Sequence, residues 1–291
     1  MRSTIVVGLG GAGGWHALAW AADEALATGG RLVLCHACPP ESPLAASGPS
    51  APMGRLELAD PQLARAVAST RARLGGDRVA LRVLPGRPAA VLVEAAADAD
   101  LVVVGWPSRS GPHGLRSTAH HVAAHAPCSV VVARPVDGRG PLAGHVVIGV
   151  DDSDAGRAAL EFGFAHADLR RRPVAAVRVA AHGDQDYWYD ETTLSTHFTT
   201  EPADLDLLAA EVEPWMRKYP EVPVKRAVFT GQPVAGLTRA ASGAALLVVG
   251  DHGRGRVARA LLGTVSDGAL ETARGPVAVV HGFERRNGGP R

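Results

Sequence analysis

The feature that most constrains the fold of this 291-residue chain is that one order of segments occurs twice. TIVVGLG (residues 4–10) corresponds to HVVIGVD (145–151), and each is a short run rich in β-branched residues followed by an Ala-rich stretch with helical spacing. The later pairs keep this order: LRVLPGRP (81–88) with VKRAVFTGQP (224–233), DADLVVVG (98–105) with GAALLVVG (243–250), and APCSVVVAR (126–134) with RGPVAVVHG (274–282). The sequence therefore predicts a tandem duplication.

We predict an N-terminal domain over residues 1–136 and a C-terminal domain over 143–284, joined by a Gly- and Pro-rich segment at 135–144. Within each copy, strands alternate with helices. Continuous apolar runs such as LVVVG and LLVVG are typical of strands that are buried on both faces. The expected fold class is therefore α/β, with two tandem doubly wound parallel sheets that carry helices on each side.

Composition restricts the classes of partner. Lys plus Arg total 30 and Asp plus Glu total 29, so the net charge of +1 argues against binding to nucleic acid or an anionic membrane. The sequence contains no uncharged apolar run of about 18 residues, the length that would predict a membrane span. The N-terminal MRSTIVVGLGG lacks the flanks of a signal peptide, and only 3 cysteines are present. We expect a cytoplasmic protein.

Two polar segments, 39–54 and 182–202, follow the second predicted strand of each copy and are expected to be mobile surface loops. The second contains Tyr187, Trp188 and Tyr189 in succession. These aromatic residues would either close over a ligand, dock a partner or anchor the loop by ordinary packing.

GDHGRGRVARALLGT (250–264) follows a predicted strand and precedes a predicted helix. In an open parallel sheet, ligands bind beyond the carboxyl ends of the strands, where the strand order reverses. Glycines there let backbone N–H groups approach a phosphate, and the start of the helix would add its amides and its dipole. Thr264 would serve as an N-cap or bind a phosphate oxygen. A simple turn before a capped helix is the alternative.

The spacing of this stretch, G-x2-G-x9-G-[S/T], resembles the nucleotide loop of the universal stress protein family. The similarity continues over both halves, including VIGVDDSDAGRAALEFGFAHA (147–167). The resemblance implies, for each half, a five-stranded parallel sheet of the adenine-nucleotide α-hydrolase-like, Rossmann-like type. It also implies binding of ATP, with Mg²⁺, and signalling through nucleotide with slow hydrolysis at most.

The resemblance places adenosine at the end of the first strand of the second half, adenine beside the second strand, ribose at the end of the fourth strand and phosphates on the glycine loop. The cofactor-binding residues are, in that order, Gly149, Val150 and Asp151; Val179; Val249 and Gly250; and Gly253, Gly263, Thr264, Val265 and Ser266.

Asp151 has two functional interpretations and one structural one. Its carboxylate would accept a hydrogen bond from adenosine or help to hold a phosphate-bound Mg²⁺. Alternatively it is the N-cap of the following helix in DDSD. Arg254, Arg256 and Arg259 would add positive charge near phosphates or remain solvated.

The first half departs from the family pattern. Gly10 stands in the place of Asp151, Ser108 in the place of Gly253, and Arg116 and Ser117 in the places of Gly263 and Thr264. Pro107 and Pro112 also remove amide donors. We predict an intact nucleotide site in the second half and a weakened or lost site in the first. GLGGAGG (8–14) suggests a dinucleotide fingerprint, but no acidic residue follows at the end of the second strand to hold a ribose.

Two other groups of residues were candidates for chemistry. Cys35 and Cys38 form a CxxC, for which packed or loop thiols are favoured over a redox or metal pair. His121 and His125, with His120 adjacent, share a predicted helix face, for which a polar surface is favoured over a metal site. We assign no catalytic or metal-binding residue.

The leading hypothesis is an ATP-binding regulatory protein of the stress response with an unidentified protein partner. The alternatives are a nucleotide-independent interaction module and a slow ATPase. The family pairs its final strands between subunits, so a tandem chain would pair PCSVVVAR with PVAVVHG internally as a pseudo-dimer, and a further homodimer is a second option.

Overall fold

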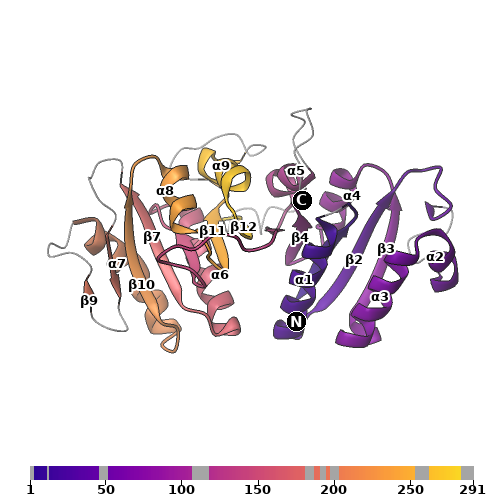
Figure 1. Ribbon diagram of the computed structural model, residues 1–291, viewed down its shortest axis with the longest axis horizontal. Helices are drawn as coiled ribbons and strands as arrows, with labels where there is room; N and C mark the ends of the chain where they lie inside the picture. Colours follow the sequence, from indigo (N-terminus) through magenta and orange to yellow (C-terminus); the bar gives the residue numbers. More distant parts are fainter. Residues whose placement is uncertain are drawn as a thin grey trace, which may run out of the picture. The chain divides into compact units, whose positions relative to one another are not determined.

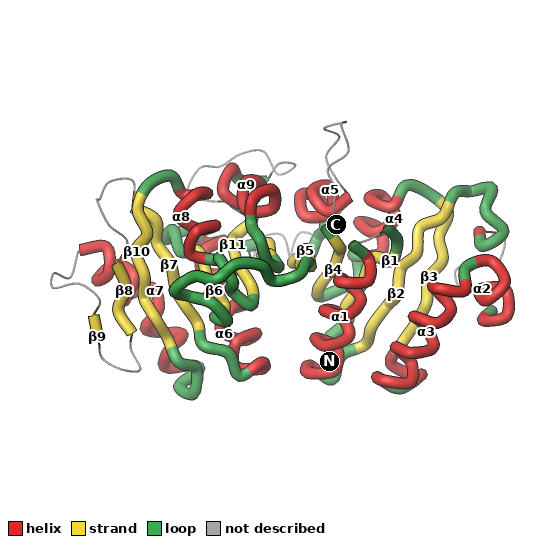
Figure 2. Tube along the Cα trace, in the orientation of Figure 1, coloured by secondary structure: helices red, strands yellow, loops and turns green. Residues whose placement is uncertain are grey.

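The computed structural model describes residues 3–11, 13–45, 52–106, 118–180, 187–190, 195–196, 203–252 and 262–282. The chain divides into two compact units, one from Met1 to Arg134 and the other from Pro135 to Arg291. Each unit alternates strands with helices (Figure 2).

The first unit begins with a strand and a helix, as the repeat predicts. Its elements are β1 (Thr4–Leu9), α1 (Gly14–Thr28), β2 (Arg31–Cys38), α2 (Met53–Ala59), α3 (Pro61–Leu74), a 3₁₀ turn (Gly76–Arg78), β3 (Val79–Pro85), α4 (Pro88–Ala95), β4 (Leu101–Gly105), α5 (Thr118–His125) and β5 (Ser129–Ala133). Local signals fix several of these boundaries. Asp60 caps α3 by accepting a hydrogen bond from the Leu63 N–H at 2.9 Å, and Gly29 ends α1 in the left-handed conformation.

The described strands of the first unit form one parallel sheet in the order β3-β2-β1-β4-β5. Helices α1 and α3 pack on one face, and α4 and α5 pack on the other (Figure 1). The order reverses between β1 and β4, which places the switch point of this sheet at the carboxyl ends of those two strands.

The second unit repeats this arrangement. Its elements are β6 (Val146–Gly149), α6 (Asp154–Arg170), β7 (Val174–Ala180), β8 (Tyr187–Asp190), β9 (Ser195–Thr196), α7 (Ala203–Lys218), β10 (Val224–Thr230), α8 (Pro233–Ala240), β11 (Leu246–Gly250), α9 (Thr264–Thr272) and β12 (Val277–Val280). Parallel strands run in the order β10-β7-β6-β11-β12, with α6 and α7 on one face and α8 and α9 on the other (Figure 1). The predicted doubly wound α/β fold is confirmed in both units.

In the first polar segment, residues 39–44 lie in no helix or strand, and only its last two residues, 53 and 54, belong to α2. The second polar segment differs from the expectation of a surface loop, because residues 187–190 form β8, which pairs antiparallel with β10 and with β9. The described part of the second sheet is thus larger than the five parallel strands predicted for it. Tyr187, Trp188 and Tyr189 belong to this added strand, in register with residues 226–228 of β10.

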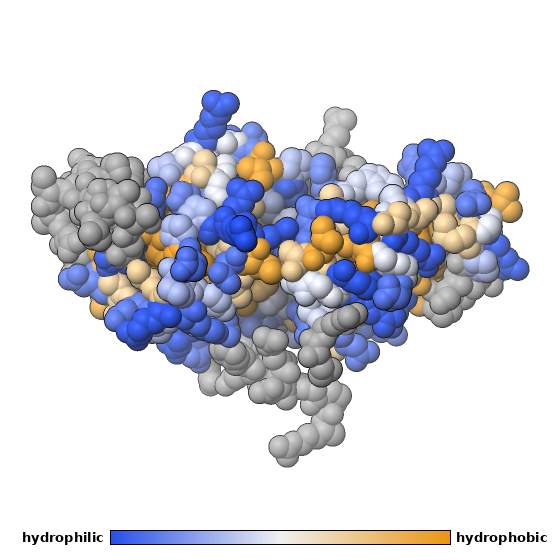
Figure 3. Space-filling view, turned by 90° about the horizontal axis from the view of Figure 1, so that it is seen from below, coloured by the Kyte–Doolittle hydropathy of each residue, from blue (hydrophilic) through white to orange (hydrophobic). Residues whose placement is uncertain are grey.

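The core consists mainly of strand residues. Leu101 to Val104 of β4 and Leu246 to Val249 of β11 are all buried, which confirms that these strands are covered on both faces. On the face drawn in Figure 3, hydrophilic residues cover much of the described surface, with hydrophobic residues in small groups between them. Over the described residues, the helices are too short or too polar to traverse a lipid bilayer.

Candidate functional site

The candidate site lies at the switch point of the second sheet. β6 pairs with β7 on one side and with β11 on the other, so the ends of β6 and β11 are neighbours. Their register pairs Ile148 with Val248, and the next residues along each strand are therefore also adjacent. This brings together the predicted residues Gly149 to Asp151 and Val249 to Gly250. Val179 lies one strand away, on β7.

The turn after β6 is organised by Asp151. Its Oδ1 accepts hydrogen bonds from the Ser153 N–H at 3.2 Å and from the Ser153 hydroxyl at 2.5 Å. Ser153 in turn caps α6, because its Oγ accepts a hydrogen bond from the Gly156 N–H at 2.9 Å. The interpretation of Asp151 as the N-cap is therefore wrong. Asp151 instead orients the residue that caps the helix.

The two described ends of the glycine loop meet each other. The Gly263 N–H donates to the Asp251 carbonyl at 2.8 Å, and the Asp251 N–H donates to the Val280 carbonyl of β12 at 2.8 Å. Helix α9 therefore starts directly beyond the end of β11. Gly263 is its N-cap, with φ −62° and ψ 152°, so the N-cap role suggested for Thr264 is wrong. Thr264 is the first residue of the helix.

Ser266 links the first turn of α9 to the end of β11. The residue is 2% exposed, and its hydroxyl lies 2.5 Å from the Gly250 carbonyl and 3.3 Å from the Asp251 carbonyl. Of the residues expected to hold phosphates, Ser266 thus uses its hydroxyl on the backbone, while its N–H remains part of the first turn of α9. Gly253 and the arginines at 254, 256 and 259 lie outside the described residues.

The apolar residues of the predicted site differ in exposure. Val150 and Val249 are buried. Val179 is half-buried and packs against α8, where a Cβ added to Gly236 would lie 2.7 Å from Val179 Cγ1. A flat ring laid against β7 would contact Val179 more readily than the other two valines.

Two polar features of the site were missed by sequence analysis. Asp251 is 4% exposed, and its Oδ2 lies 3.2 Å from Nδ1 of His252. Arg178, on β7, pairs with Asp152 and Asp204. The glycines of GDHG give no indication of the contact between Asp251 and His252, although these two residues directly follow the strand end. The partners of Arg178 lie 26 residues away in either direction, so no local pattern indicates them.

The equivalent place in the first unit has different chemistry. The Trp106 N–H donates to the Ala133 carbonyl at 3.1 Å, as Asp251 does to Val280, so Trp106 stands in the place of Asp251. The guanidinium carbon of Arg134 lies 4.3 Å from the centroid of the Trp106 indole, and the ring of His120 lies 5.3 Å away. Burial lowers the pKa of Arg134 to about 10. A cation on an aromatic ring thus replaces a buried acid.

The other departures of the first half are only partly visible. Gly10 follows β1 with φ 153°, a conformation that side chains rarely adopt. Pro107, Ser108, Pro112, Arg116 and Ser117 lie outside the described residues.

The cysteines of the CxxC lie within β2. Because side chains alternate along a strand, Cys35 and Cys38, three residues apart, point to opposite faces of the sheet. Both are buried, and Cys38 Sγ lies 3.7 Å from the Leu84 carbonyl. The preferred interpretation of packed thiols is confirmed, and a redox or metal pair is excluded by geometry.

The Cys35 thiol is expected to resist alkylation at pH 8 while the protein is folded. Burial raises its pKa to about 11, although the positive charge of Arg82 acts in the opposite direction. Roughly one thiol in a thousand would then be ionised, and the thiolate is the nucleophile. Iodoacetamide labelling followed by mass spectrometry measures this, with denatured protein as the control. Equal labelling rates in the folded and denatured states would contradict the prediction.

The histidines of α5 do share a face. The rings of His121 and His125 stack at 4.2 Å, and His125 Nδ1 lies 2.8 Å from the His121 carbonyl. Burial, and then the neighbouring His125, lower the pKa of His121. His120 instead is buried beside Trp106.

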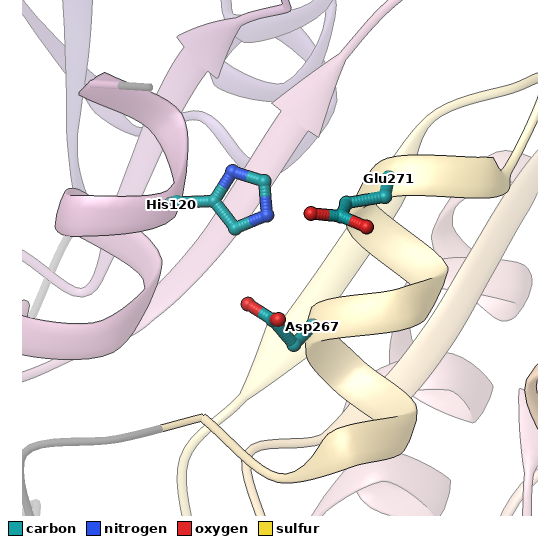
Figure 4. Close-up of side chains that lie close together, drawn as sticks. All are labelled: His120, Asp267 and Glu271. Carbon is teal, nitrogen blue, oxygen red and sulfur yellow. The ribbon is translucent and has the colours of Figure 1, made fainter. Parts of the chain in front are cut away.

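Acidic side chains also share a face of α9. Asp267 and Glu271 both project from that helix of the second unit (Figure 4). Exposed acidic groups at this spacing are common without an ion. Among the described residues of either unit taken by itself, no three potential metal ligands come together.

The family model described as the universal stress protein family matches residues 1–134 and 143–281. A universal stress protein of Mycobacterium tuberculosis is 31% identical over 279 residues, covering 90% of this chain and 91% of that protein. Another from Mycolicibacterium smegmatis is 30% identical over 284 residues, covering 91% and 92%. The crystal structure of a universal stress protein from Archaeoglobus fulgidus matches with a TM-score of 0.65 at 15% identity, covering 97% of both chains.

Two doubly wound α/β units in tandem define the class of this protein as a two-domain protein of Rossmann-like fold. The family model covers most of both units, and a relative that is covered over 91% of its length is 31% identical in sequence. The chain therefore belongs to the universal stress protein family. A solved universal stress protein in complex with cAMP covers 45% of this chain at 24% identity with a TM-score of 0.34, a likeness too low to bear on the ligand of this chain.

Proposed function

We propose that the second unit binds ATP with Mg²⁺ and that the protein acts as a nucleotide-dependent regulator in the stress response, with little or no hydrolysis. The proposal assigns no catalytic residue. Regulation would require the nucleotide to bind one conformation more tightly than another, because a ligand with equal affinity for two states shifts neither. Nucleotide binding would act most directly by changing the surface that a protein partner contacts.

The observation that carries this proposal is the position of the first turn of α9. The hydrogen bond from Gly263 to Asp251 holds this turn at the end of β11, beside the end of β6. The first N–H groups of a helix have no partner within the helix, and its dipole favours an anion there. The N–H groups of Thr264, Val265 and Ser266 would therefore hold the phosphates, as at other helix N-termini that bind phosphate.

The turn after β6 fits the adenosine end of the ligand. Asp151 is half-buried and its carboxylate is fixed by Ser153, so a hydrogen-bond acceptor is already oriented beside β7. A ribose hydroxyl or an adenine amino group would donate to it, and Mg²⁺ coordination is the alternative role. Val179 would pack against the adenine ring. These residues fit a nucleotide that spans β7, β6 and β11.

The first unit is proposed not to bind ATP in this manner. Trp106 and Arg134 occupy the strand ends there, with the guanidinium stacked over the indole. Trp106 stands in the place of Asp251, so an indole ring replaces the buried carboxylate of the second unit there. The asymmetry predicts how many nucleotides the chain binds.

Calorimetric titration of nucleotide-free protein with Mg-ATP is expected to show one site per chain. Mass spectrometry of protein purified under native conditions gives an independent count of co-purified adenine nucleotide. A stoichiometry of two would show that the first unit also binds. Absence of binding in both measurements would refute the proposal and favour an interaction module that does not depend on nucleotide.

A further inference from the structure

Arg178 joins three elements of the second unit at the carboxyl end of β7. Its Nη1 lies 2.9 Å from Asp152 Oδ1, in the turn after β6, and its Nε lies 3.2 Å from Asp204 Oδ1, in the first turn of α7. The Arg178 side chain is only 16% exposed, whereas Asp152 and Asp204 are 33% and 35% exposed. The pairs are therefore less accessible to water than ordinary surface ion pairs, and screening weakens them less.

Asp152 has a backbone conformation that benefits from such a restraint. Its φ is 61°, in the left-handed region that residues other than glycine adopt at a cost. It stands between Asp151 and Ser153, whose side chains are hydrogen-bonded to each other. The contact with Arg178 thus holds the middle residue of the turn that orients Asp151.

The guanidinium geometry is specific. A single planar group reaches two carboxylates on different elements through two of its nitrogens. A lysine ammonium is a point charge at the end of a flexible chain and would not reproduce this fixed fork. The bridge therefore ties the turn after β6 to the start of α7.

The first unit provides an internal comparison. Gly8 pairs with Cys35, and the corresponding Gly149 pairs with Val177, so the following residues His36 and Arg178 occupy equivalent places. His36 contacts the end of the first strand, since its Nδ1 lies 3.1 Å from the carbonyl of Leu9, the last residue of β1. Arg178 reaches further, to the turn beyond the first strand of its unit, where it forms an ion pair with Asp152 beside Asp151.

We infer that Arg178 is a positioning residue of the nucleotide site, an inference that rests on the proposed function of the second unit. Its bridge to Asp152 and Asp204 holds the turn from Asp151 to Ser153 where adenosine is expected. Arg178 itself does not contact the nucleotide. Loss of the bridge should therefore weaken every ligand that contains adenosine, whether or not it carries phosphates.

Replacement of Arg178 by methionine tests this role, because the change keeps the aliphatic length and removes both donors. Without nucleotide, hydrogen exchange of the amides at 151–156 is expected to become at least about tenfold faster. Affinities for adenosine and for ATP should fall by a similar factor, about tenfold each. Arg178→Lys should recover part of the affinity. Arg217→Met, which removes an exposed arginine paired with Glu213 on α7, is the control and should change neither measurement.

Asp152→Asn is the second variant and covers the case in which Arg178→Met does not fold. It removes the charge of one arm while Asn still tolerates a positive φ. It should change exchange and affinity in the same direction as Arg178→Met, by a smaller factor, because Asn still accepts a hydrogen bond and the pair with Asp204 remains. Unchanged exchange, or unchanged affinity in a wild-type protein that does bind ATP, would overturn the positioning role. If the wild-type protein bound neither adenosine nor ATP, the proposed function would fail first, and the exchange data would still show whether the bridge holds the turn.

Discussion

Replacing Gly263 by aspartate is expected to weaken ATP binding by about a hundredfold or more. Gly263 is the N-cap of α9 in an extended conformation, with φ −62° and ψ 152°, which aspartate adopts without strain. Its carboxylate would accept the same N–H groups that a phosphate would use. Two like charges about 4 Å apart at a protein surface repel by about 4 kcal/mol, which is up to three powers of ten in affinity.

Adenosine separates this effect from a loss of structure. Without phosphates, adenosine should bind Gly263→Asp about as well as it binds the wild type. Thermal stability should be unchanged or slightly higher, because aspartate is a better N-cap than glycine. Gly263→Asn has nearly the same shape without the charge and should lose less ATP affinity than Gly263→Asp. Gly54→Asp adds a carboxylate at an open position on α2 of the first unit and should have no effect. Equal calorimetric heats of ATP for Gly263→Asp and wild type would disprove the assignment.

Replacing Gly105 by alanine is expected to destabilise the first unit by about 3 kcal/mol or more. Gly105 ends β4, and a Cβ added there would lie 2.0 Å from the Gly13 carbonyl oxygen and 2.2 Å from its carbon. Both atoms belong to the backbone at the start of α1, so neither is able to move aside without displacing the helix from the sheet. Overpacking against backbone is therefore more costly than overpacking against a flexible side chain.

Urea denaturation followed by hydrogen exchange measures this effect in each unit separately, which matters because two units need not unfold together. Amides of β1, β4 and α1 should lose protection in Gly105→Ala, while those of β6 and β11 should keep it. Gly54→Ala is the matched control, because its Cβ would meet no atom within 4 Å. That substitution in a helix should leave stability unchanged or raise it by up to about 1 kcal/mol. An unaltered urea midpoint for Gly105→Ala would contradict this prediction and show that the backbone at Gly13 shifts at little cost in free energy.

Regular elements of this fold were predictable because their signals are local and repeated. Apolar runs such as residues 101–104 and 246–249 bury both faces of a strand, and the duplication supplies each signal twice. Strand β8 was not predictable, because residues 187–190 become a strand by pairing with the edge of β10. Such pairing depends on a neighbour that is distant in sequence, and β propensity is a weak guide to it.

Polar contacts of the site were predictable only in part. The glycine pattern indicates where α9 starts, but not that the Ser266 hydroxyl would bond the Gly250 carbonyl. Serine side chains choose between nearby backbone groups, and small differences in geometry decide which one they bond. Arg178 shows the limit most clearly, since its two acidic partners come from different elements. Only the assembled fold brings them together.

The hydrogen bond between Gly263 and Asp251 also bears on how this family can vary. It holds the two ends of the intervening segment together, so α9 is anchored to β11 independently of the chain in between. Segments whose two ends are held together tolerate changes of length and composition better than segments that determine where the following helix lies. Variation in this segment is therefore expected to change what it binds, including the phosphates that Gly253 is proposed to hold, while the start of the helix stays in place.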